Sequence, residues 1–234
     1  EGVEATVNPF DMYAIEESVR LKERYGGEVT AVSMGPPQAE ASLREALAMG
    51  CDKAVLLTDK AFAGADTLAT AYTLACGMRK IGTYDIVVCG SKTTDGDTGQ
   101  VGPGLAEELG ISHVSYVRKI TAVGEALINV ERTLDDYYER VEAPLPCLIT
   151  VTKEINEPRL PSLKGKLMAK RAQITVWNAE GLGSDPKRFG LNGSPTRVIK
   201  VFHPSPRRGG EIITGSPEIQ ADMLVEKLKE LGVL

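Results

Sequence analysis

The stretch Cys89–Pro103, CGSKTTDGDTGQVGP, joins two segments with different hydrophobic patterns. The preceding run, Tyr84–Val88 (YDIVV), is short and apolar like a buried strand, whereas Gly104–Leu109 (GLAEEL) has helical spacing. A glycine-rich loop between a buried strand and a helix is typical of an open parallel sheet, where ligands bind beyond the carboxyl ends of the strands. The loop therefore indicates both the fold and the position of a candidate site.

The same alternation continues toward the N-terminus. Asn8-Pro9 is typical of a helix start, because Asn is a good N-cap and Pro fits the first helical position. Amphipathic helices and apolar strands then follow one another in this order: helix Pro9–Tyr25, strand Val29–Val32, helix 43–49, strand Ala54–Leu57, helix Thr67–Arg79 and strand Ile86–Val88. Continuous apolar strands between amphipathic helices predict an α/β fold with a doubly wound, mostly parallel sheet that helices cover on both faces.

The pattern changes after Ser112. Strands of alternating polarity are expected at His113–Ile120, Ala126–Leu134 and Tyr137–Val141, and the fully apolar Cys147–Val151 is expected to rejoin the main sheet. Residues 156–170 are rich in Pro and Lys and have no clear class. Residues 184–215 predict an extended arm, with a final helix at 222–231. We therefore expect one α/β domain over 1–183 and an arm over 184–234 that needs a partner surface.

Composition limits the kinds of function. The 234 residues are 42% hydrophobic and 25% charged, as in ordinary globular proteins, and the net charge of −5 argues against a general nucleic-acid-binding surface. Four cysteines without a CxxC pair and two histidines indicate neither a metal site nor a catalytic triad. We assign no catalytic side chain and no metal ligand, so any chemistry is expected to come from a bound cofactor.

The opening loop has the properties of a phosphate-binding loop at a helix N-terminus. Residues suited to close main-chain approach or hydroxyl donation are Gly96, Gly99, Gly102, Thr94 and Thr98. The loop is also acidic, and we expect Asp97 to cap the following helix and Asp95 to accept from ribose hydroxyls or to brace the loop. The loop matches neither GxGxxG nor GxxxxGK[ST], which makes a Rossmann dehydrogenase or a P-loop NTPase unfavourable. A tight turn without a ligand is the alternative.

Three segments in order carry a resemblance to a known family: NPFDMYAIEESVRLKE from Asn8, GSKTTDGDTGQVGP from Gly90 and NEPRLPSLKGKLMAK from Asn156. ALAMG (Ala46–Gly50) and the closing EKLKELGVL agree with them, so the resemblance covers essentially the whole chain. The chain resembles the beta subunit of an electron transfer flavoprotein. Members of that family begin with a strand and a VKQVPD-type loop that are absent here. We expect the missing strand to lie inside the sheet and its loop to touch the nucleotide, so the chain alone should be unstable and its site incomplete.

The resemblance implies a heterodimer with an alpha subunit, in the cytoplasm of a prokaryote or the mitochondrial matrix of a eukaryote. Asp95–Pro103 (DGDTGQVGP) is similar to members that bifurcate electrons and carry FAD in the beta subunit. There NADH is the donor, one electron goes to ferredoxin or flavodoxin, and the other goes through the alpha flavin to an acyl-CoA dehydrogenase or quinone-linked acceptor. The first alternative is a conventional beta subunit with structural AMP, which serves acyl-CoA dehydrogenases and a quinone reductase. The second is a non-redox adenine-nucleotide-binding module, which the arm and the 156–170 segment disfavour.

The resemblance also implies site residues. Asn8, Pro9, Phe10 and Asp11 form a first piece of the nucleotide site, with Phe10 near the alpha-subunit flavin; Ser33 and Met34 form a second, in which Met34 contacts adenosine through its backbone or is simply core. The third piece is Gly90, Ser91, Lys92, Thr93, Thr94, Asp95, Gly96, Asp97, Thr98, Gly99, Gln100 and Val101. Residues 156–170 match the recognition loop for redox partners, with Leu163 as the apolar anchor and Lys164 and Lys166 steering acidic partners. Alternatively, Leu163 packs on its own subunit and the lysines are only a solvated face.

Overall fold

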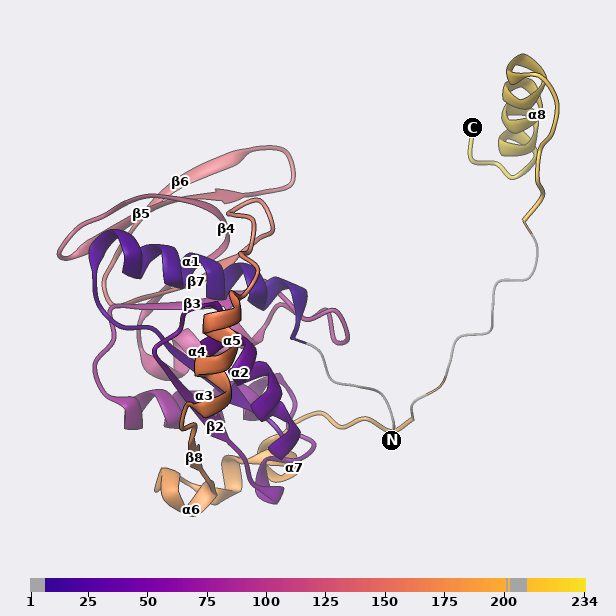
Figure 1. The fold of residues 1–234 in the computed structure, drawn as a ribbon. Coiled ribbons are helices and arrows are strands. Elements are labelled where there is room, and N and C mark those ends of the chain that lie inside the picture. The colour runs from indigo at the N-terminus through magenta and orange to yellow at the C-terminus, as the bar shows by residue number, and fades with distance from the viewer. Residues whose placement is uncertain (1–6, 201, 203–209) are drawn as a thin grey trace. The chain divides into compact units, whose positions relative to one another are not determined.

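The computed structural model describes residues 7–200, 202 and 210–234. The chain forms two compact units, residues up to Arg197 and Val198–Leu234 (Figure 1). The boundary lies later than the expected one at 183, because Phe189 is fully buried against Phe62 and Tyr72 of the first unit. Among the described residues no helix has the length and apolar character needed to cross a membrane.

The first half of the chain alternates helices and strands as predicted, with boundaries shifted by a few residues. The elements are α1 (Pro9–Tyr25), β1 (Thr30–Met34), α2 (Glu40–Met49), β2 (Lys53–Leu57), α3 (Thr67–Ile81), β3 (Ile86–Gly90) and α4 (Val101–Leu109). Pro9 occupies the first turn of α1, and Gly26 ends the helix at a positive φ of 81°. Local signals at helix ends therefore suffice to place α1.

The second half contains a strand meander, two further strands and several short helices. The elements are β4 (Ser112–Val123), β5 (Leu127–Thr133), β6 (Tyr138–Pro144), β7 (Cys147–Val151), α5 (Leu163–Arg171), β8 (Thr175–Trp177), α6 (Ala179–Leu182), α7 (Gly190–Gly193) and α8 (Pro217–Glu230). The helix α5 was not predicted, since residues 156–170 had no clear class. The final helix α8 begins five residues before the predicted position, at Pro217 rather than 222.

The strands form two sheets rather than the single sheet that the sequence predicted. One sheet has the order β1-β2-β8 and is wholly parallel, whereas the other has the order β3-β7-β4-β5-β6. In the second sheet β3, β7 and β4 are parallel, and β4, β5 and β6 form an antiparallel meander. Parallel pairings therefore dominate, and β7 rejoins the main sheet as predicted.

Helices cover both faces of the parallel strands, as the apolar strands predicted. Along β7, Ile149 packs with Ala14 of α1, whereas the next-door Leu148 packs with Leu105 of α4. Along β2, Leu56 packs with α1 and α2, and Leu57 packs with α3. Because consecutive strand residues point to opposite faces, this arrangement requires strands that are apolar throughout. The fold is therefore the predicted doubly wound α/β architecture.

Candidate functional site

The first turn of α1 lies against the carboxyl end of β3, where the glycine-rich loop begins. The Gly90 N–H donates a hydrogen bond to Asp11 Oδ1 at 2.9 Å. Asn8 Nδ2 donates to the Lys92 carbonyl at 2.9 Å and to Asp11 Oδ2 at 3.0 Å. The structure thus brings together two of the three predicted pieces of the site, which lie about eighty residues apart in the sequence.

Gly90 is required at this junction for a reason that the sequence analysis missed. A Cβ atom on Gly90 would lie 2.6 Å from Asp11 Oδ1 and 2.8 Å from the carbonyl carbon of Phe10. Gly102, predicted to allow close approach to a ligand, instead makes room for Thr150, since its Cβ would lie 2.6 Å from the Thr150 methyl carbon. These two glycines therefore serve the packing of α1 and α4 against the sheet.

Asn8 occupies the N-cap position of α1 but does not act as the predicted side-chain cap. Its amide nitrogen instead donates to the Lys92 carbonyl and to the Asp11 carboxylate, and no backbone N–H of α1 donates to its side chain. The amide oxygen, Asn8 Oδ1, is buried and has no hydrogen-bond partner among the described residues. Buried hydrogen-bond acceptors normally have a donor, so we expect a further group to donate a hydrogen bond to this oxygen.

The two loop aspartates bond within the loop. Asp97 was predicted to cap α4, but the N-cap of α4 is Gln100, and Asp97 Oδ1 instead pairs with Lys92 Nζ at 2.6 Å. That ion pair raises the pKa of Lys92. The Thr93 hydroxyl and the Gly96 N–H, which donates to Asp95 Oδ1 at 2.7 Å, lower the pKa of Asp95. Asp95 therefore braces the loop, one of the two predicted roles.

The start of α4 keeps the features that favour an anion. Its N-cap Gln100 makes no side-chain cap and accepts from the Thr67 hydroxyl at 2.9 Å, so the first N–H groups of α4 remain free of side-chain caps. Thr94 and Thr98 are exposed on the same loop. Uncapped N–H groups at a helix start, together with hydroxyl donors, form a suitable environment for phosphate.

Ser33 and Met34 lie at the carboxyl end of β1, in the other sheet. Met34 is partly buried and packs against the cluster that contains Leu57 and Phe189. The core role considered for Met34 is therefore present in the structure. The contact of Ser33 and Met34 with adenosine stays a prediction.

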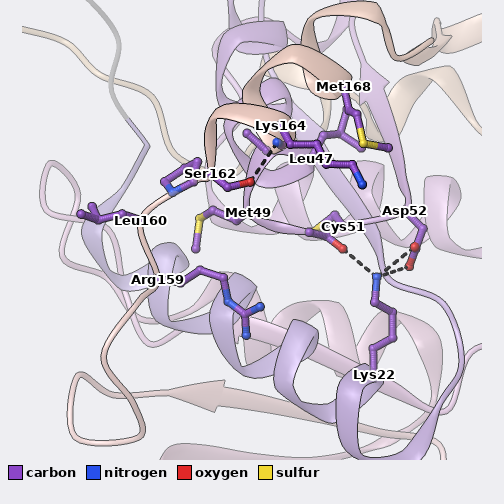
Figure 2. Close-up of a pocket in the computed structure, with 14 residues that line it drawn as sticks. Lys22, Leu47, Met49, Cys51, Asp52, Arg159, Leu160, Ser162, Lys164 and Met168 are labelled. Carbon is purple, nitrogen blue, oxygen red and sulfur yellow. Dashed lines mark hydrogen bonds and ion pairs between the residues drawn. The ribbon is translucent and has the colours of Figure 1, made fainter.

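A second candidate surface surrounds α5. Ser162 caps this helix through a hydrogen bond from Gly165 N at 3.0 Å, and Leu163 is 76% exposed rather than packed within the chain. Beside the helix lies a hollow of about 460 Å³ between the end of α2, Lys22 of α1 and the segment from Arg159 to Met168 (Figure 2). Lys164 lines the hollow and Lys166 is exposed on the same helix.

The segment before α5 is held against α1 by ion pairs. Arg159 Nε contacts Glu16 Oε2 at 2.7 Å, and its Nη1 contacts Glu23 Oε1 at 2.5 Å. Glu16 is only 2% exposed; burial by itself raises its pKa, but hydrogen bonds from Arg159 and Arg20 outweigh burial and hold the pKa below its usual range. The same helix thus holds the loop at its first turn and the Arg159 segment through Glu16 at its middle and Glu23 near its end.

Comparison with known proteins shows which family the chain is similar to. The sequence profile described as "Electron transfer flavoprotein domain" matches residues 1–182. The electron transfer flavoprotein subunit beta of Thermoanaerobacterium thermosaccharolyticum is 50% identical over 235 residues, covering 100% of this chain and 90% of that protein. The caffeyl-CoA reductase-Etf complex subunit CarD of Acetobacterium woodii is 46% identical, with coverage of 100% and 90%. Protein FixA of Azorhizobium caulinodans is also 46% identical, with coverage of 97% and 84%.

Proposed function

The chain belongs to the electron transfer flavoprotein family, on its beta-subunit and FixA branch, and from this premise we propose that it binds FAD at the Gly90–Val101 loop and acts in electron bifurcation. Together with an alpha subunit it takes electrons from NADH. One electron goes to ferredoxin or flavodoxin, and the other goes through the alpha subunit to an acyl-CoA dehydrogenase or a quinone-linked acceptor. FAD supplies the change from two-electron to one-electron transfer.

The observation that carries the proposal is the joining of α1 to the loop at the carboxyl end of β3. Asn8 donates to the Lys92 carbonyl and Asp11 accepts from the Gly90 N–H, so α1 holds the start of the loop, and the loop leads into α4 at Val101. The uncapped N–H groups of α4 and the exposed Thr94 and Thr98 would hold the phosphates of a nucleotide. The unpartnered Asn8 Oδ1 supports a ligand at this junction, because such an acceptor needs a donor.

The choice of FAD over AMP rests on the loop sequence. Asp95–Pro103 reads DGDTGQVGP, and Asp95 and Asp97 are both bonded within the loop. These bonds neutralise part of the charge of the loop and would permit either anionic nucleotide, so it is the similarity of this loop sequence to that of bifurcating members that favours FAD. The relative CarD carries the name of a caffeyl-CoA reductase-Etf complex, which supports an acyl-CoA-linked partner for the present chain.

Two surfaces would serve the partners. Leu163 is an exposed apolar side chain at the start of α5, with Lys164 and Lys166 beside it, and this combination suits a pocket on an acidic redox partner. The second unit, Val198–Leu234, carries a helix, α8, that has no buried residue, and we assign its apolar side chains to packing on the alpha subunit.

Cofactor stoichiometry tests the proposal. The chain is co-expressed with its alpha subunit and purified without added nucleotide, and FAD and AMP are then quantified after denaturation. We expect two FAD and no AMP per heterodimer. One FAD with one AMP would contradict bifurcation and leave the conventional beta subunit, whereas AMP without any redox cofactor would favour the non-redox module.

A matched pair of variants assigns the second flavin to the loop. Thr98→Glu places a negative charge beside the expected phosphates and should remove one FAD per heterodimer. Thr83→Glu makes the same change at an exposed threonine before the amino end of β3, away from the loop, and should keep both flavins. Equal flavin content in the two variants would place the second flavin elsewhere.

A further inference from the structure

Tyr116 has a backbone conformation that aromatic residues rarely adopt. Its φ is +60°, in the left-handed region, where the Cβ atom crowds the backbone. It lies within β4 at an irregularity in the pairing with β7, between Val114 and Val117. Strain of this kind persists only where the surroundings enforce it, and it is concentrated at functional sites.

The surroundings of Tyr116 do enforce the conformation. The Tyr116 N–H donates to the Thr150 hydroxyl at 3.1 Å, and Thr150, near the carboxyl end of β7, is only 2% exposed. The methyl group of Thr150 also lies against Gly102 in the first turn of α4. One buried threonine therefore fixes both the strained residue and the helix that begins at the loop.

The strained backbone directs the phenol to the glycine loop. A methyl group on Gly99 would lie 3.4 Å from the Tyr116 phenol oxygen, so the hydroxyl is next to the loop backbone. The side chain is 45% exposed, so packing in the core does not account for the strain.

We propose that Tyr116 is a binding residue of the nucleotide site, whose hydroxyl donates a hydrogen bond to a phosphate oxygen held by the loop. This inference rests on the proposed nucleotide-binding function and adds a residue from β4 to it. The hydroxyl, not the ring face, is the part nearest Gly99, and phosphate oxygens accept such a bond strongly because they are charged. The strain in β4 is then the cost of aiming a donor at the ligand.

Binding of AMP and adenosine to the nucleotide-stripped heterodimer tests the inference. Tyr116→Phe removes only the hydroxyl, and we expect it to weaken AMP about 10- to 100-fold while leaving adenosine, which has no phosphate, unchanged. Tyr137→Phe is the control, because Tyr137 is 63% exposed and precedes β6. Unchanged AMP affinity in Tyr116→Phe would overturn the inference. If the unaltered protein binds neither AMP nor FAD, the proposed function fails as well.

A second variant separates a binding role from a merely structural one. Tyr116→Gly suits a positive φ and should keep or raise the midpoint of urea unfolding of the nucleotide-free protein, while it weakens AMP as Tyr116→Phe does. An unchanged or raised unfolding midpoint together with weaker AMP binding would support the inference that the strained backbone of Tyr116 is kept for ligand binding. A fall in the unfolding midpoint in proportion to the loss of AMP affinity would show that Tyr116 is only structural.

Discussion

At Gly90 the first turn of α1 lies so close to β3 that only a hydrogen atom fits on the α-carbon. A Cβ there would meet Asp11 Oδ1 at 2.6 Å and backbone of Phe10 at 2.8 Å. We expect Gly90→Ala to lower the free energy of unfolding by about 1–3 kcal/mol, because α1 must shift away from the strand. Urea unfolding measures this change. Gly124→Ala is the control, because a Cβ atom on Gly124 would lie 3.5 Å from its nearest neighbour, the Leu127 carbonyl oxygen, which is an ordinary contact distance. An equal loss of stability in this variant would contradict the explanation.

The carboxylate of Glu16 makes stability depend on pH. Because burial is outweighed by hydrogen bonds from Arg159 and Arg20, its folded pKa lies below the usual 4.5. A lowered folded pKa gives stability that is present above the unfolded pKa and is lost as pH falls through the folded pKa, from about pH 5 downward. In Glu16→Gln, the free energy of unfolding measured in urea should therefore fall less steeply as the pH is lowered below about 5.

The same variant should lose stability at neutral pH. Glu16→Gln leaves the guanidinium of Arg159, which is 33% exposed, without its buried partner, and we expect a loss of about 1–3 kcal/mol. The exposed Glu45→Gln is the matched control and should change neither the neutral value nor the acid slope. Identical acid slopes for the unaltered chain and Glu16→Gln would contradict the role assigned to Glu16.

The helix α5 could not be predicted from its sequence, for a reason visible in its packing. Its contact with α2 uses Gly165 and Ala169, which are small, so the usual apolar stripe is replaced by close backbone approach. A Cβ on Gly165 would lie only 2.4 Å from the Ala48 carbonyl oxygen. In β7, by contrast, large apolar residues make the packing, so its strand pattern can be recognised in the sequence.

Gly165→Ala should displace α5 from α2. We expect a loss of about 1–3 kcal/mol in the free energy of unfolding, because a backbone carbonyl cannot move aside as a flexible side chain does. Lys170→Ala on the same helix removes an exposed side chain and should stay within about 0.5 kcal/mol of the unaltered chain. If the two variants were equally stable, α5 would not be held through Gly165.

The sequence predicted where the site lies in the fold, but not the contacts that its residues make. The alternation of strand, glycine loop and helix placed the loop at the end of β3, which the structure confirms. Asp97 and Lys92 are only five residues apart, but which partner the carboxylate takes depends on how the loop folds, and the positive φ of Tyr116 depends on an irregularity in the pairing of β4 with β7. A single sequence contains no signal for either. Capping propensities favoured Asp97 and Asn8 as caps, but Asp97 lies before the N-cap Gln100 and pairs with Lys92 of its own loop, and the Asn8 amide donates to Lys92 and Asp11 instead.

At the scale of the molecule, the two units differ in how they bury apolar surface. The four buried clusters consist of residues up to Phe189, so the first unit contains its own core. In the second unit α8 has no buried residue, and its exposed apolar side chains are Ile219, Met223, Leu224 and Val225. An apolar helix face of this kind needs a partner surface to cover it.

Ending the chain after Arg197 should leave the stability of the first unit unchanged but abolish its association with the alpha subunit. Because the core lies entirely in the first unit, we expect the free energy of unfolding of that unit to change by less than about 0.5 kcal/mol. Association with the alpha subunit should be lost, since the apolar side chains of α8 are removed, and co-purification of the tagged alpha subunit measures this. Ile219→Asp with Met223→Asp in the complete chain should reproduce the loss, whereas Glu218→Asp, on the same helix, should not. Full association of the shortened chain would show that the alpha subunit binds the first unit instead.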